Sequence, residues 1–124
     1  FPEMKWHPAL VIPDAMFGID QHGQFTFCNT ACLYLLGYRD PADLLGQSAH
    51  TLLHPMNSED RPVPIEDCQF CQAMLRGELT HFERENFLDG SNNIISVECW
   101  IRPLLQGNIA LGSVATIKKL VEEK

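Results

Sequence analysis

Residues 17–46 constrain the fold more than any other part of this chain of 124 residues. Gly23 can take the positive φ of a tight turn, and Asn29 or Thr30 can cap a short helix that Gly37 ends. Around Gly23, apolar residues recur at every second position, which is the period of half-buried strands; they are Phe17, Ile19, Phe25 and Phe27. We therefore expect a hairpin that runs directly into a capped helix.

Further short helices are expected in the middle of the chain. Asp40 can cap one helical turn at 41–45, and a second short helix is predicted at 48–54, ended by Pro55. Residues 56–64 are rich in polar residues and proline, which predicts a loop. Residues 65–76 then have the apolar spacing of a single amphipathic helix.

From residue 81 onward the apolar period changes to two. Strands are predicted at 81–88, 94–101 and 109–117, joined by turns at 89–92 and 106–108. Helices placed between two groups of strands are typical of an α+β fold with an antiparallel sheet. Glu83 and Glu85 are expected to share one solvated strand face, and residues 117–124 have the spacing of the start of a connecting helix.

Several short motifs together resemble a PAS domain over about residues 9–118. They are Gly-Ile-Asp-x-x-Gly-x-Phe-x-Phe-x-Asn at 18–29, Leu-Gly-Tyr at 36–38, Leu-Leu-Gly at 44–46 and the Asp-Gly-Ser turn at 89–91. The resemblance implies a five-stranded antiparallel sheet with short helices packed over one face. Residues 1–8 would then be an N-terminal lead-in, and residues 119–124 the start of a linker to an output domain.

The same resemblance implies a function. PAS domains are sensors that commonly dimerise, often hold a small ligand between sheet and helices, and pass a signal to an attached output domain. That output domain would be a histidine kinase of a two-component system or a transcription factor. The residues expected to contact a small-molecule ligand are Phe27, Leu33, Leu36, Leu53, Met74, Asn86 and Trp100. A ligand-free module for dimerisation and protein interaction is the alternative.

Composition limits the other function classes. The net charge of −7 argues against direct nucleic-acid contact, which needs clustered Lys and Arg. No apolar run reaches the length of about 18 residues that marks a membrane span. Nucleophile-elbow and phosphate-loop motifs are absent from the sequence, so we do not expect an enzyme. The five cysteines are an odd number, which favours free thiols in the reducing cytoplasm.

The sequence does not identify a cofactor. Where light-oxygen-voltage flavin domains carry their reactive Cys and a phosphate-binding Arg, this chain has Ala49 and His50, so flavin is not expected. A haem ligated by His50 or His54 stays an alternative.

Two histidines and two cysteines have the spacing of a zinc site, and they are His50, His54, Cys68 and Cys71. Because Pro55 directly follows His54, and buried cysteines are commonly inert, we assign no metal ligand at this stage and keep zinc as a further alternative.

Overall fold

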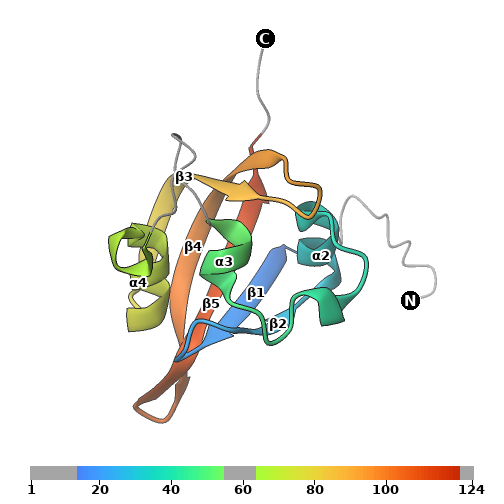
Figure 1. Ribbon diagram of the computed structural model, residues 1–124. Coiled ribbons are helices and arrows are strands. Elements are labelled where there is room, and N and C mark those ends of the chain that lie inside the picture. Colours follow the sequence, from blue (N-terminus) through green and yellow to red (C-terminus); the bar gives the residue numbers. More distant parts are fainter. Residues whose placement is uncertain (1–13, 55–63, 121–124) are drawn as a thin grey trace, which may run out of the picture.

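The computed structural model describes residues 14–54 and 64–120. Its sheet is antiparallel, five-stranded and ordered β2-β1-β5-β4-β3, so the C-terminal strand lies in the middle (Figure 1). The strands are β1 (Ala15–Asp20), β2 (Phe25–Cys28), β3 (Thr80–Leu88), β4 (Ile94–Gln106) and β5 (Ile109–Lys119). The expected α+β fold with a five-stranded antiparallel sheet is confirmed.

Three short helices cover one face of this sheet, which we call the inner face. They are α2 (Thr30–Leu36), α3 (Ala49–Leu53) and α4 (Gln69–Arg76), and Figure 1 shows them over the same side. Two 3₁₀ turns, η1 (Pro41–Asp43) and η2 (Ile65–Asp67), complete the helical layer. The core lies between the two layers, and its largest fully buried side chains include Phe17, Phe25, Phe70 and Phe87. The other face of the sheet, the outer face, carries no helix in the described part of the chain.

Local capping signals account for most of the helix boundaries. The Asn29 side chain accepts a hydrogen bond from the backbone N–H of Cys32 and so starts α2, which ends at Gly37 in the left-handed conformation. Asp40 caps η1 and Ser48 caps α3 in the same way. The predicted caps Asn29 and Asp40 are confirmed, whereas Ser48 and His54, both inside the helix predicted at 48–54, flank α3 instead.

The predicted single helix at 65–76 is wrong. Cys68 has extended backbone angles, φ −95° and ψ 105°, so η2 ends before it and α4 begins after it. The Cys68 thiol takes the place of a capping side chain and accepts from the backbone N–H of Cys71, with 3.4 Å between N and Sγ. Periodicity alone does not show this break because the apolar spacing continues through it.

Two register shifts in the sheet change which face a side chain occupies. Between Gly18 and Ile19 the pairing with β2 shifts, so that Phe25 points into the core whereas Phe27 lies over Gly18 on the outer face. A second shift in β3 turns Glu85 to the inner face, while Glu83 stays exposed. The expected shared face of Glu83 and Glu85 is therefore wrong.

The ends of the last two strands also differ from the prediction. β4 continues to Gln106 instead of ending at residue 101. Ile117 belongs to β5 and pairs with Ala15 and Cys99, so the predicted connecting helix does not begin there. Residues 121–124 and, apart from Pro64, the predicted loop at 56–64 lie outside the described residues. No helix in the described ranges is long and apolar enough to cross a membrane.

Candidate functional site

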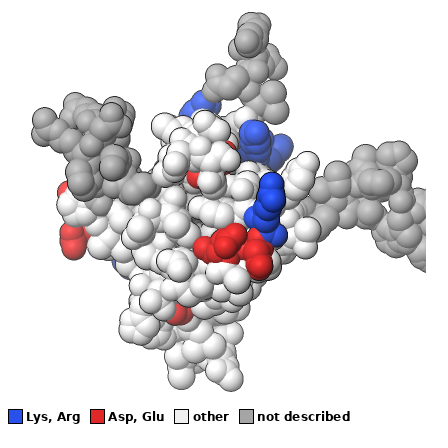
Figure 2. Space-filling view, turned by 45° about the vertical axis from the view of Figure 1, so that its right-hand side comes forward, with Lys and Arg blue, Asp and Glu red and all other residues white. Residues whose placement is uncertain are grey.

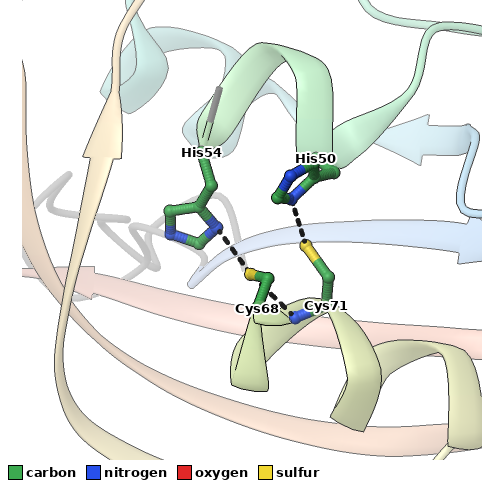
Figure 3. A group of neighbouring side chains, drawn as sticks. All are labelled: His50, His54, Cys68 and Cys71. Carbon is green, nitrogen blue, oxygen red and sulfur yellow. Dashed lines mark hydrogen bonds between the residues drawn. The ribbon is translucent and has the colours of Figure 1, made fainter. Parts of the chain in front are cut away.

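The ends of α3 and α4 bring two histidines and two cysteines together (Figure 3). His50 lies in the first turn of α3 and His54 directly follows its last residue, a spacing that places both imidazoles on one side. Cys68 caps α4 and Cys71 lies in the first turn of that helix. All four side chains point into the space between the two helices, and we call this group the His/Cys cluster.

Each histidine of the His/Cys cluster contacts one cysteine. His50 Nδ1 lies 3.2 Å from Cys71 Sγ, and His54 Nδ1 lies 3.6 Å from Cys68 Sγ. The four potential ligand atoms all lie within 4.8 Å of one another. Because the two histidines come from one helix and the two cysteines from the other, any ion held by all four would join the helices.

The cluster is enclosed by the core. Cys68 and Cys71 are buried, and His50 is 9% exposed. The His54 ring makes edge contacts with Phe70 and Phe87, with centroid distances of 5.4 and 5.0 Å. The polar groups of the cluster are therefore shielded from water on the side of the sheet, where their interactions are stronger than at the surface.

One further polar side chain reaches the cluster from the sheet. Glu85 Oε1 lies 3.4 Å from His54 Nε2, because the register shift in β3 turns this carboxylate inward. His54 Nε2 is buried and has no hydrogen bond of good geometry within the described part of the chain. Sequence reasoning missed Glu85, and the alternation around it gave no signal of the shift.

The contacts within the cluster change the protonation of its members. A hydrogen bond with Cys71, followed by the contact with His54, lowers the pKa of the Cys68 thiol against the opposing effect of burial. The hydrogen bond between the two thiol side chains raises the pKa of Cys71, and burial of the Cys71 thiol raises it further. Burial lowers the pKa of His54, but its contacts with Cys68 and Glu85 outweigh that effect and raise the pKa to about 9. The shifts of Cys68 and His54 favour the charged forms of these two groups, the Cys68 thiolate and the His54 imidazolium.

The seven residues predicted to contact a small ligand do not lie around one space. Leu36, Leu53 and Met74 are fully buried in the core, and Leu33 packs against its edge. The remaining three lie on the outer face: Phe27, Asn86 and Trp100. Next to the cluster, a cavity lined by His50, Phe70, Cys71 and Met74 among others has a volume of about 10 Å³, roughly that of one water. That space does not fit a haem.

The outer face presents an apolar surface with aromatic residues. Phe27, Trp100 and Leu104 are 36%, 38% and 41% exposed. The Trp100 ring stacks on His81, with 5.1 Å between ring centroids and 12° between ring planes, and His81 Nε2 lies 2.7 Å from Glu98 Oε2. In this fold Trp100 is an outer-face residue because its neighbours Cys99 and Ile101 are buried in the core.

Solved structures with this fold come from diverse signalling proteins. The PAS domain of an HTR-like protein from Haloarcula marismortui is 20% identical, with a TM-score of 0.64 over 87% of this chain and 82% of that one. The PAS domain of nitrogen regulation protein NR(II) from Vibrio parahaemolyticus is 14% identical, with a TM-score of 0.62 over 86% and 88%. VqmA from Vibrio cholerae is 15% identical, with a TM-score of 0.63 over 92% of this chain and 49% of VqmA.

These identities are low, so the structures show the shared fold. No curated protein matches the chain. The model of the family described as PAS domain matches residues 13–118, which is most of the sequence and includes the hairpin, the helical layer and the last three strands. The chain therefore belongs to the PAS domain family.

Proposed function

We propose that this PAS domain is the input module of a signalling protein, that it forms a homodimer through the outer face of its sheet, and that it signals to an attached output domain. The observation that carries this proposal is that no helix among residues 14–54 and 64–120 covers the outer face. A sheet face without a covering layer leaves apolar area in contact with water, and Phe27, Trp100 and Leu104 supply such area here.

A second copy of the chain is the occupant that fits this face. The outer face carries both acidic and basic groups around its apolar centre, among them His81, Glu98 and Arg102. A two-fold arrangement places the same patch on both partners, so a patch with both signs of charge can pair with itself. VqmA, one of the similar structures, is described as a dimer in the absence of its target DNA.

The central position of β5 supports a route to an output domain. β5 pairs with β1 on one side and β4 on the other, and its last residue is Lys119. A movement of β1 or β4 would therefore also move the C-terminal end of β5. The output would be a histidine kinase or a transcription factor; similar folds occur in nitrogen regulation protein NR(II) and in VqmA.

We further propose that the domain acts by binding rather than by catalysis and works in the cytoplasm. All five cysteines are free thiols, which suits a reducing compartment. Direct contact with nucleic acid is not part of the proposal, since the net charge is −7. On the face shown in Figure 2, acidic side chains adjoin a basic one and most of the surface is uncharged.

Small-ligand binding stays a prediction from the family. The space beside the cluster measures about 10 Å³, so a ligand of drug size, which needs a pocket of roughly 300 Å³ or more, could bind there between sheet and helices only by opening the core. The described core favours the interaction role over a preformed ligand cavity.

Light scattering coupled to size-exclusion chromatography tests the dimer. We expect a dimer for the full chain and a monomer for Trp100→Arg, because a charge in the centre of an apolar interface must be desolvated without a partner. Tyr34→Arg is the matched control, since Tyr34 is 88% exposed on α2 and lies away from the outer face. A monomeric wild-type chain, or a Trp100→Arg variant that stays dimeric, would contradict the proposal.

A further inference from the structure

We propose that the His/Cys cluster binds one divalent metal ion of the zinc class, with His50, His54, Cys68 and Cys71 as its four ligands. The ion would be held by two thiolates and two imidazoles in a closed tetrahedral site. This inference goes beyond the proposed function and does not depend on it, because self-association is proposed for the other face of the sheet and output for the C-terminal end of β5.

The donor set selects the class of metal. Two thiolates and two imidazoles are the ligands of many structural zinc sites, and tetrahedral S₂N₂ coordination is typical of Zn²⁺ among the divalent ions. Four protein ligands leave no open position for a substrate. The site would therefore stabilise the fold, or respond to the presence of the metal ion, rather than catalyse a reaction. Ions that prefer oxygen ligands, such as Mg²⁺ and Ca²⁺, do not fit.

The distances between the donor atoms agree with a single ion. Zn–S bonds of about 2.3 Å and Zn–N bonds of about 2.0–2.1 Å at tetrahedral angles place adjacent ligand atoms about 3.3–3.8 Å apart. The two measured N–S distances, 3.2 and 3.6 Å, are close to this range. With all four atoms within 4.8 Å of one another, only a small contraction of the cluster would complete the coordination.

Local structure already orients the ligands. The break at Cys68 between η2 and α4 turns its thiol toward His54, and the first turn of α4 presents Cys71 to His50. His54 directly follows Leu53, the last residue of α3, and its side chain still points into the cluster although the helix has ended. Ligands on helix ends with defined caps are held in place before the ion arrives, which favours binding.

Glu85 provides the kind of support that metal-binding histidines commonly have. With Nδ1 of His54 on the metal, the ring's Nε2–H faces the Glu85 carboxylate at 3.4 Å. A carboxylate that accepts from the outer nitrogen fixes the ring orientation and strengthens the ligand. A small movement of either group would give His54 Nε2 the hydrogen bond that it lacks.

Charge balance also favours a bound ion. Binding releases to solvent whatever protons the thiols and imidazoles carry on their ligand atoms, and two thiolates then neutralise the charge of a divalent cation in a largely buried place. Cys99 shows the contrast within the same protein: it is fully buried in the core and lies opposite Phe82 and Ile117 in the sheet. Cys99 has the surroundings of a packing residue, whereas each cysteine of the His/Cys cluster faces a histidine.

Cobalt(II) titration of the reduced, chelator-treated full chain tests the proposal. We expect saturation at one ion per chain, with the intense visible bands of tetrahedral Co²⁺ and a thiolate-to-metal charge-transfer band. Zinc added afterwards should displace the cobalt and abolish both signals, because Zn²⁺ binds such sites more tightly than Co²⁺. The weak bands of octahedral cobalt, or no saturable binding by the folded wild-type chain, would overturn the inference.

Variants assign the ligands. Cys68→Ser and Cys71→Ser should each remove the charge-transfer intensity of one thiolate, and His54→Gln should weaken binding at least ten-fold. Cys28→Ser and His22→Gln are the matched controls, since among the described residues neither belongs to a group of potential metal ligands; Cys28 contacts Cys32, and His22 is exposed in the β1–β2 turn. Circular dichroism checks that each variant folds. Binding by Cys68→Ser and Cys71→Ser equal to that of the controls would overturn the inference.

Glu85→Gln tests the supporting carboxylate separately. We expect its zinc affinity, measured by competition with a chromogenic chelator, to fall about 10-fold or more while the cobalt spectrum stays tetrahedral. Glu83→Gln, an exposed neighbour on the same strand, should keep the wild-type affinity. Equal affinities for the two variants would show that Glu85 does not support the site.

Discussion

At the scale of single residues, Gly112 is the position where the backbone leaves no choice of side chain. Gly112 has φ +153° and pairs with Asp20 where β5 meets the end of β1. A Cβ atom there would collide with the backbone carbonyl of Ile19, and a main-chain atom in a paired strand cannot move away cheaply. The glycine therefore allows the central strand to approach β1 closely.

We expect Gly112→Ala to lower the free energy of unfolding by about 3 kcal/mol or more, since it adds both an unfavourable φ and a backbone clash. Gly107→Ala is the matched control. Gly107 also has a positive φ, +64°, but no atom lies within 4 Å of its Cβ position. We expect Gly107→Ala to lower the free energy of unfolding by only about 1 kcal/mol. Urea unfolding measures both values, and similar losses would refute the argument from close approach.

At the scale of elements, Asn29 joins the hairpin to the helical layer. Its Oδ1 accepts from the backbone N–H groups of Met16 and Cys32, and its Nδ2 donates to the backbone carbonyl of Asp14. One side chain thus caps α2 and holds that helix against the start of β1. A seven-residue helix is too short to be stable alone, so α2 depends on such contacts.

We expect Asn29→Ala to destabilise the domain by about 2 kcal/mol, at the upper end for an N-cap, because a tertiary link is lost with the cap. Asp40→Ala is the comparison. The Asp40 side chain caps only the exposed turn η1, by accepting one hydrogen bond from the backbone N–H of Ala42. Its replacement should therefore lower the free energy of unfolding by less than about 1 kcal/mol. Thermal and urea unfolding measure the difference. Equal losses would mean that Asn29 acts as a cap alone.

At the scale of the whole molecule, the His/Cys cluster joins parts that packing alone holds together. α3 and α4 are short; α3 contacts the sheet chiefly at β3, whereas α4 contacts β5, β4, β3 and β1. An ion bound by both would crosslink the helical layer over the core, and its binding energy would add to the stability of the folded state. The outer face would be unaffected, so dimerisation and metal binding are separable.

We therefore expect zinc to raise the melting temperature of the full chain and a chelator to lower it. A ligand at about 1,000 times its Kd adds about 4 kcal/mol at 25 °C. Because the ligands must be deprotonated, the zinc-induced rise should be present at neutral pH and shrink as the pH falls. Differential scanning calorimetry with and without one equivalent of zinc measures this. Cys71→Ser is the control, and the same rise in that variant would contradict the site.

Neighbouring residues in the sequence were enough to predict much of this structure. The turn at Gly23, the caps at Asn29 and Asp40, and the change of apolar period near residue 81 are local signals, and the described elements follow them. Local signals work here because caps and tight turns satisfy backbone groups within a few residues.

Only the tertiary structure decided the faces of the sheet and the assembly of the cluster. The two register shifts that send Phe27 outward and Glu85 inward depend on the partner strand, not on the alternation of the shifted strand itself. The sequence identified the four cluster residues as one possible set, yet 14 to 21 residues separate the members of each His–Cys pair. Their approach depends on how α3 and α4 pack on a common sheet, and spacing along the chain does not encode that distance.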